Sequence, residues 1–226
     1  MARCVEDAGL LLGVLAGQTY EQPHGTCLKG VCIGISRKIV DDENSEWIDA
    51  NEKLIGIMRE LGAGCVGISP HRIDTGFIFS IMRHEFKIGI NEYLQALQNP
   101  AIPQSLQGII EYNEQHPDIA LKYGQDILIR DNTSAGTSEP EYSEALKARD
   151  AAICKLDKLF DDSCIDVLFM FSSDMNLAVS TGFPSMTIPL GKTSKGLPIG
   201  SFFVARRHRE DMLLKTTYAI QNAISR

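Results

Sequence analysis

Residues 180–206 read STGFPSMTIPLGKTSKGLPIGSFFVAR. Two apolar runs, at 185–190 and 199–205, flank a segment at 191–198 that is rich in glycine, proline and lysine. Long apolar runs with little alternation are typical of strands that are covered on both faces. The residues between them are turn formers, which predict a short connection. The stretch therefore predicts a hairpin of two strands that are covered on both faces.

The rest of the chain alternates between helical and strand patterns. A strand at 30–36, a helix at 46–61 and a strand at 65–68 form a βαβ unit, which predicts a parallel pair of strands. A further buried strand is predicted at 166–171, and helices at 5–16, 76–97, 105–115, 119–131, 141–160 and 209–225. The sequence thus predicts a single α/β domain over residues 1–226, with a mixed, largely buried β-sheet flanked by helices on both faces.

Two local patterns give further expectations. In the first helix, Ala8, Leu11, Leu12 and Leu15 fall on one face, which predicts that this face packs against the core. Residues 132–140 form a Ser/Thr/Gly-rich stretch between two helical patterns, and such composition predicts a flexible loop.

Charge and hydropathy exclude several classes of protein. The formal net charge of −7 disfavours binding to nucleic acid or to an anionic membrane surface, because both need a basic face. The longest apolar run, at 8–17, is too short to span a bilayer. The first residues lack the basic segment, apolar core and cleavage site of a secretion signal, so a cytoplasmic location is expected.

The six cysteines include no Cys-x-x-Cys pair. The spacing of Cys27 and Cys32 leaves a metal or redox pair as one alternative. Reduced, mostly buried thiols in a cytoplasmic protein are the simpler interpretation. No cofactor and no metal are expected.

Several motifs resemble, in the same order, those of the amidase signature family, which hydrolyses amide bonds with a Ser–Ser–Lys triad. The motifs are MARCVEDAGLLLGVLAG at 1–17, LKGVCIGI at 28–35, HEFK at 84–87, NEYL at 91–94, YGQD at 123–126, DVL at 166–168, and GFPSMTIPLG with GLPIGSFF in the hairpin. The pattern is more similar to stand-alone bacterial and fungal amidases than to the amidotransferase that acts on glutamyl-tRNA. The resemblance covers nearly the whole chain and implies a partial amidase signature fold.

The resemblance also implies that the catalytic part is missing. In the family, both serines and the lysine precede the Met-Ala-Arg helix, and this sequence begins at that methionine without any Gly-Gly-Ser-Ser-Gly run. A serine needs a base to become a nucleophile, and the developing oxyanion needs positioned N–H donors. We therefore expect no catalytic residue in these 226 residues. The chain is then a truncated, inactive C-terminal portion of an amidase.

One loop is a candidate for substrate contact. The resemblance implies that the loop after strand 166–171 lines the acyl-side pocket, which assigns vestigial substrate binding to Phe171, Ser172, Ser173, Asp174 and Met175. The simpler interpretation is a polar turn that leaves a strand. A rebuilt nucleophile at Ser172 or Ser173 is a third interpretation, although no glycine-rich elbow surrounds the pair.

Three other clusters have a chemical and a structural interpretation. Cys65 and His71 could form a nucleophile–base pair, or be a buried thiol and a loop imidazole. His84 precedes a glutamate, but the fourth residue after it is Ile88, so the second histidine of a zinc site is lacking. The basic run at 206–209 is either a solvated helix start or an anion site.

These observations leave three hypotheses. The first is an amidase-family hydrolase by descent, which acts on a small-molecule amide only if the missing half completes it. The second is a non-catalytic binding or assembly module that uses the residual pocket or an exposed sheet edge. The third is an independent enzyme with a rebuilt site. Removal of a covering half would expose apolar surface and an unpaired strand, so self-association through the sheet edge is also expected.

Overall fold

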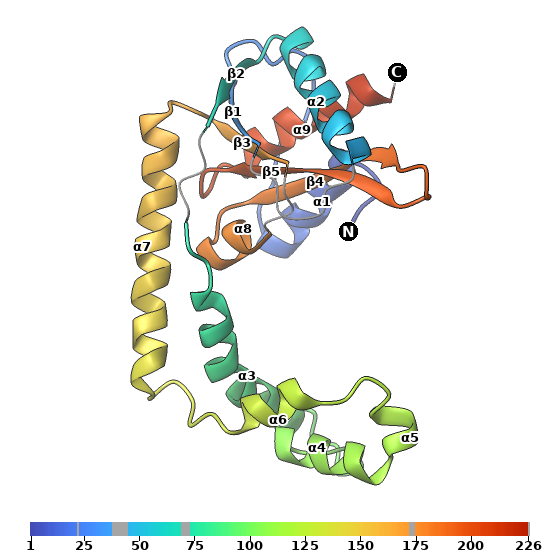
Figure 1. The fold of residues 1–226 in the computed structure, drawn as a ribbon, viewed down its shortest axis with the longest axis vertical. Coiled ribbons are helices and arrows are strands. Elements are labelled where there is room, and N and C mark those ends of the chain that lie inside the picture. Colours follow the sequence, from blue (N-terminus) through green and yellow to red (C-terminus); the bar gives the residue numbers. More distant parts are fainter. Residues whose placement is uncertain (22, 38–44, 69–72, 172–174, 226) are drawn as a thin grey trace. The chain divides into compact units, whose positions relative to one another are not determined.

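A computed structural model gives the fold, and it describes residues 1–21, 23–37, 45–68, 73–171 and 175–225 (Figure 1). The chain divides into two compact units, one made of residues 1–73 and 153–226 and the other of residues 74–152. The expectation that residues 1–226 act as a single domain stays a prediction. Among the described residues, no helix combines the length and the apolar character needed to cross a membrane.

The first unit is built on a mixed sheet of five strands. The strands are β1 (Cys32–Ser36), β2 (Gly64–Gly67), β3 (Val167–Met170), β4 (Ser185–Lys192) and β5 (Pro198–Ala205). Their order is β2-β1-β3-β5-β4. β1 is parallel to both β2 and β3, whereas β5 is antiparallel to β3 and β4. The predicted βαβ unit, hairpin and mixed sheet are confirmed.

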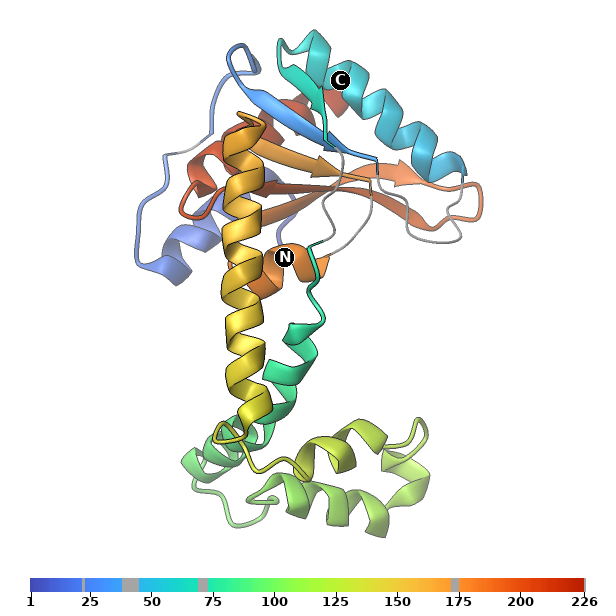
Figure 2. The same ribbon diagram turned by 60° about the vertical axis from the view of Figure 1, so that its left-hand side comes forward.

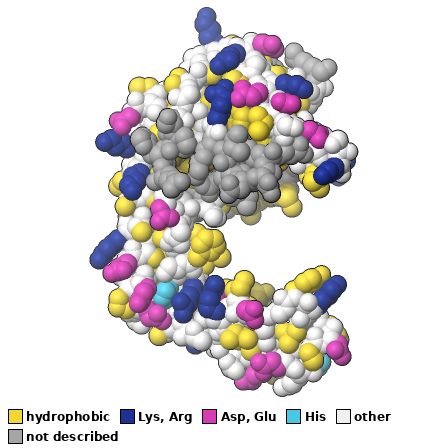
Figure 3. Space-filling view, viewed as in Figure 1, with side chains coloured by type: hydrophobic (Ala, Val, Ile, Leu, Met, Phe, Trp, Pro, Cys, Tyr) yellow, Lys and Arg dark blue, Asp and Glu magenta, His cyan; other side chains and the backbone are white. Residues whose placement is uncertain are grey.

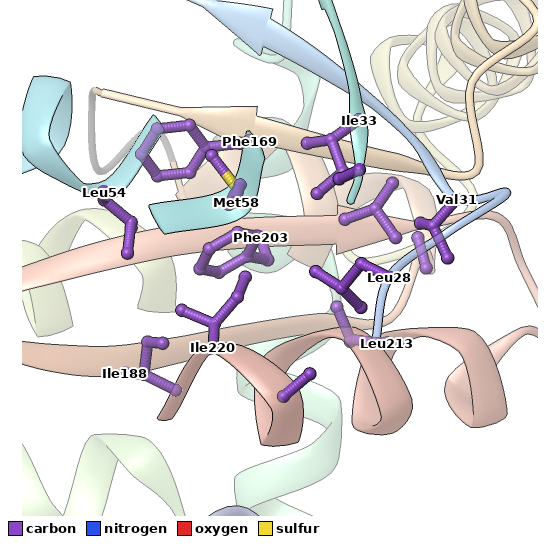
Figure 4. Packing of buried hydrophobic residues seen from close by; sticks show 14 of the residues in the cluster. Leu28, Val31, Ile33, Leu54, Met58, Phe169, Ile188, Phe203, Leu213 and Ile220 are labelled. Atoms are coloured by element: carbon purple, nitrogen blue, oxygen red, sulfur yellow. The ribbon is translucent and has the colours of Figure 1, made fainter. Parts of the chain in front are cut away.

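Helices cover both faces of this sheet, as the sequence predicts. Because successive side chains of a strand point to opposite faces, Phe169 and Phe203 lie on one face, with α2 (Ser45–Glu60) and α9 (Glu210–Ile224). Figure 4 shows this cluster from close by. Leu168 and Val204 point to the other face, where the C-terminal part of α7 (Pro140–Asp162) and the short helix α8 (Met175–Thr181) pack. Figure 2 shows the helices on either side of the strands.

The two strands of the opening stretch differ in their surroundings. β5 lies inside the sheet and is buried along most of its length. β4 is at the edge of the sheet, and Ile188 is its one buried residue. The prediction that both strands are covered on both faces is therefore wrong for β4. An apolar run predicts burial but does not reveal which strand of a hairpin has a neighbour on only one side.

Helix α1 (Val5–Ala16) has the predicted bounds, but its buried face is not the predicted one. Its buried residues are Val5, Gly9 and Gly13. Leu11 and Leu15, which the periodicity places toward the core, are 44% and 77% exposed. The helix is apolar around most of its circumference, so periodicity could not identify the buried face. The glycine face is the one that lets α1 approach another helix closely.

The second unit is helical. It contains α3 (Phe77–Ala96), α4 (Leu106–Gln115), α5 (Pro117–Ala120), α6 (Asp126–Asn132) and the first part of α7. The single helix predicted at 119–131 is wrong, because Gly124 adopts a left-handed conformation (φ +72°) between α5 and α6. Ser105 caps α4, since its side chain accepts a hydrogen bond from the backbone N–H of Gly108.

Candidate functional site

The end of β3 is anchored by two hydrogen bonds. The backbone N–H of Phe171 donates to the carbonyl of Ser36 at the end of β1 (3.1 Å), and Trp47 Nε1 on α2 donates to the carbonyl of Phe171 (2.9 Å). The Phe171 side chain is 2% exposed and lies 5.6 Å from the Phe169 ring, centroid to centroid. The ring is therefore part of the core, and the loop that follows leaves the sheet from a fixed point.

The structure describes only part of the predicted substrate-contact loop. Ser172, Ser173 and Asp174 lie outside the described residues. Met175 begins α8, a helix that the sequence patterns did not reveal. The assignment of Phe171–Met175 to substrate contact stays a prediction.

An ion pair lies beside the end of β3. The Arg37 guanidinium lies 5.8 Å from the centroid of the Phe171 ring, and its Nε donates to Glu52 Oε1 at 2.6 Å. The hydrogen bond from Arg37 lowers the pKa of Glu52 below its ordinary value. Both side chains are more than two-fifths exposed. Their charges are therefore largely matched to each other and screened by water.

A cleft of about 410 Å³ opens in the first unit, against α2, β4, β5 and the end of α9. Its lining comprises Glu46, Asp49, Ala50, Lys53, Leu54, Ile57, Leu190, Gly191, Lys192, Ile199 and Ile224. Glu46 is engaged by the hairpin loop, because its carboxylate accepts from the backbone N–H (2.7 Å) and the hydroxyl (2.6 Å) of Ser194. The described lining includes no serine, cysteine or histidine, so the cleft has an apolar floor and a charged rim but no obvious nucleophile.

The cysteines do not form an activated nucleophile. All six are free thiols, and none is buried: Cys27, Cys154 and Cys164 are exposed and the other three are half-buried. The expectation of mostly buried thiols is therefore wrong, because most of them lie at element ends or on outward faces. Burial raises the pKa of Cys65, which disfavours the reactive thiolate. His71, its suggested base, lies outside the described residues.

His84 is the most buried ionisable group of the second unit. It is 2% exposed on α3, with Nε2 3.1 Å from Glu139 Oε2 and Nδ1 2.6 Å from the carbonyl oxygen of Ser80. The Ser80 hydroxyl lies 3.5 Å from the same Nδ1, a spacing that suggests a nucleophile and its base. However, Nδ1 donates its proton to the Ser80 carbonyl, so it cannot accept the hydroxyl proton. His84 is therefore a structural residue.

The zinc alternative for His84 has no support among the described residues, where no three His, Cys, Asp or Glu side chains are grouped to hold a metal ion. The neighbouring Glu85 instead accepts a hydrogen bond from the Tyr142 hydroxyl at 2.6 Å. Lys87 donates to the carbonyl of Asn132 at 2.8 Å rather than pairing on its own helix.

Glu139 connects His84 to the loop before α7. Its Oε1 accepts from the backbone N–H of Ala135 and from the hydroxyl of Ser134 (3.3 Å). Ser134 is 2% exposed. The composition of residues 132–140 predicts a flexible loop, but these bonds tether it to α3. The tether joins residues 55 positions apart, so no local pattern could indicate it.

We expect Glu139→Gln to reduce the acid sensitivity of the second unit. The pKa of Glu139 is lowered from 4.5, chiefly by the Ala135 N–H and also by His84. A carboxyl with a lowered folded-state pKa stabilises the fold above its unfolded pKa, and this stabilisation is lost as the pH falls through the folded value. The urea midpoint, followed by circular dichroism at 222 nm, should therefore fall less between pH 7 and pH 3 in Glu139→Gln than in the parent.

The control for this experiment is Glu141→Gln, two positions further on in the exposed first turn of α7. It removes the same charge without touching the His84 contact. If both variants show the same pH dependence as the parent protein, the Glu139 tether does not contribute to acid sensitivity.

The basic run at 206–209 is neutralised by carboxylates. The three ion pairs are Arg206–Asp161 (2.6 Å), Arg207–Asp157 (2.8 Å) and Arg209–Asp211 (3.0 Å). On the face shown in Figure 3, Lys and Arg side chains likewise lie among Asp and Glu side chains. The structure therefore favours the interpretation of a solvated helix start over an anion site.

Comparison with known proteins relates the chain to amidases. No family model matches it. It is 27% identical over 204 residues to a probable amidase of Arabidopsis thaliana, with 87% of this chain and 38% of that protein covered. It is 26% identical over 266 residues to a glutamyl-tRNA(Gln) amidotransferase polypeptide of Picosynechococcus sp., with 98% of this chain and 54% of that protein covered.

Comparison with solved structures also relates the chain to amidases. An amidase family protein from Bacillus anthracis superposes with a TM-score of 0.81 and 24% identity, over 100% of this chain and 48% of the other. The chain spans about half the length of the curated relatives it matches, or less. In sequence and in fold, the chain is similar to the C-terminal part of amidases.

Proposed function

We propose that these 226 residues are the supporting half of an amide hydrolase, and that they hydrolyse no amide by themselves. The observation that carries the proposal is the agreement with an amidase fold over the whole chain but only about half of the relative (TM-score 0.81). The chemistry of amide hydrolysis requires an activated nucleophile and an oxyanion site. The proposal assigns both to the Ser–Ser–Lys segment that precedes the matched region, and no catalytic residue to this chain.

The proposed task of this half is to hold the substrate loop. The bonds of Phe171 to Ser36 and Trp47 give the loop a rigid starting point at the end of β3. Rigid elements position site residues more precisely than loops do. We propose that the segment Phe171–Met175 contacts the acyl side of the amide. The Phe171 ring lies in the core, so its proposed part is to support this contact from beneath.

The substrate class and setting follow from the same proposal. The substrate is a small-molecule amide, and the protein works in the cytoplasm without a cofactor. The similarity to the plant amidase (27%) and to the cyanobacterial amidotransferase (26%) is nearly equal, so the stand-alone type is proposed on the sequence motifs. The proposal includes no nucleic-acid or membrane partner. It includes self-association through an exposed edge of the sheet, whose edge strands are β2 and β4.

The test is an amide hydrolysis assay on two proteins. The first is the 226-residue polypeptide. The second is the same polypeptide fused behind the N-terminal segment of the Bacillus anthracis amidase family protein. We expect the first to release ammonia or amine at the uncatalysed rate from a panel of aliphatic, aryl and peptide amides. The fusion should show turnover that a Ser→Ala change of the added nucleophile abolishes, since loss of a catalytic serine costs several orders of magnitude in rate.

Two outcomes would contradict the proposal. Hydrolysis by the 226-residue polypeptide that is abolished by Ser172→Ala or Ser173→Ala would support a rebuilt catalytic site. An inactive fusion that is correctly folded would support a non-catalytic binding or assembly module.

A further inference from the structure

Helix α1 presents an apolar surface to solvent. Four large side chains are 44–80% exposed, and we call them the outer α1 face: Leu10, Leu11, Val14 and Leu15. Side chains three and four positions apart are neighbours on a helix, so Leu10 lies beside Val14 and Leu11 beside Leu15. The four side chains therefore form one continuous stripe rather than scattered exposed residues.

The inner face of α1 carries its buried residues, Val5, Gly9 and Gly13. A Cβ on Gly9 would lie 3.4 Å from the Leu214 side chain on α9, in ordinary van der Waals contact. The backbone N–H of Val5 also donates to Gln221 Oε1 at 3.1 Å. Next to the outer α1 face is a hollow of about 230 Å³, whose lining includes Leu10, Val14 and Tyr20. The exposed apolar surface therefore borders a concave region.

Apart from Glu6 and Asp7 in its first turn, α1 is apolar around its circumference. Such a pattern is typical of helices buried inside a larger protein. Single exposed apolar residues need no explanation, but a contiguous patch indicates a contact surface. A stable interface buries about 800 Å² on each partner. Four side chains of one helix supply only part of that area. The occupant is therefore a polypeptide of domain size that reaches beyond α1, rather than a second copy of the helix.

The relatives indicate which polypeptide this is. The chain covers 48% of the Bacillus anthracis protein and 54% of the cyanobacterial amidotransferase, and the matched region is C-terminal. The unmatched segment therefore precedes α1 in those proteins and is continuous with it. We propose that the outer α1 face docks the N-terminal segment of an amidase signature protein. This inference rests on the proposed function, which places the catalytic serines in that segment.

The experiment tests docking without requiring catalysis. The 226-residue chain is co-expressed with a tagged N-terminal segment of either the Arabidopsis or the Bacillus anthracis relative, and the complexes are examined by size exclusion with light scattering. We expect a 1:1 complex with at least one segment and slower hydrogen exchange of the α1 amides in it. Leu11→Glu with Val14→Glu should weaken the dissociation constant at least about tenfold, because two charges would be buried against apolar surface.

The control is Leu197→Glu, which places one glutamate at a 60% exposed leucine in the β4–β5 loop, away from α1. It should leave the complex unchanged, and far-UV circular dichroism of each variant checks that the fold is kept. Absence of a complex with both segments, or a complex that the outer-face variants do not weaken, overturns the proposal. A homodimer that those variants disperse also overturns it, in favour of a second copy.

Docking and activity can fail separately. A complex that depends on the outer α1 face but hydrolyses no amide retains the docking proposal and contradicts the proposed function. An active fusion whose turnover and stability are unchanged by Leu11→Glu with Val14→Glu contradicts docking alone.

Discussion

Phe203→Ala is expected to destabilise the first unit by about 3–5 kcal/mol, the cost of removing a fully buried aromatic side chain and leaving a cavity. Phe203 is 0% exposed in β5, and its ring centroid lies 5.0 Å from that of Phe169 on β3 (Figure 4). Whole domains are stable by only about 5–15 kcal/mol. Urea unfolding followed by the fluorescence of Trp47, the one tryptophan of the chain, measures the loss.

Trp47 suits this measurement because its indole N–H is bonded to the Phe171 carbonyl of the same unit. The control is Leu197→Ala, which truncates a side chain that is 60% exposed in the β4–β5 loop of the same unit. It should change the unfolding free energy by less than about 0.5 kcal/mol. If both variants unfold at the same urea concentration, the packing around Phe203 contributes far less than its burial implies.

Much of the fold could be predicted because its signals are local. The end of α1 follows from Gly17, which adopts the left-handed conformation (φ +61°) that caps many helices. The start of α4 follows from Ser105, a typical N-cap residue. The inner strands β1, β3 and β5 are short apolar runs. Because both faces of these strands are buried, apolar and polar residues do not alternate along them.

The errors arise where the deciding contact is distant or where several faces are equally apolar. The inner face of α1 depends on the fit of Gly9 against Leu214, far away in the sequence, and nothing in α1 itself distinguishes that face. β4 and β5 have similar composition, and only their places in the sheet make one exposed and the other buried.

The candidate site is less accessible to sequence reasoning than the fold. The contact of His84 with Glu139 and that of Trp47 with Phe171 span 55 and 124 positions, so neither has a local signature. In the sequence, His84 instead invites comparison with a metal motif, because its immediate neighbour is a glutamate. The motif order that resembles the amidase signature family carries the functional inference, and physical reasoning on single residues serves mainly to exclude alternatives.

Gly34→Ala and Gly67→Ala are expected to have opposite effects, although both add one methyl group to a glycine of a neighbouring strand. In β1, a Cβ on Gly34 would lie 2.6 Å from Ile165 Cδ1 and 2.7 Å from Ile68 Cδ1. Both isoleucines are buried and would have to move, which costs about 1–3 kcal/mol in a packed core. In β2, a Cβ on Gly67 meets nothing within 4 Å.

Neither glycine has the positive φ that would penalise alanine, so the backbone contribution is the same for both and favours the substitution. Replacing glycine by alanine at such a position stabilises by about 0.4–1 kcal/mol, because the unfolded chain loses freedom. Gly67→Ala should therefore raise the urea midpoint of Trp47 fluorescence, whereas Gly34→Ala should lower it. A midpoint for Gly34→Ala at or above that of Gly67→Ala would mean that Ile68 and Ile165 repack without cost. In that case, the packing of these isoleucines against β1 would not explain why position 34 is a glycine.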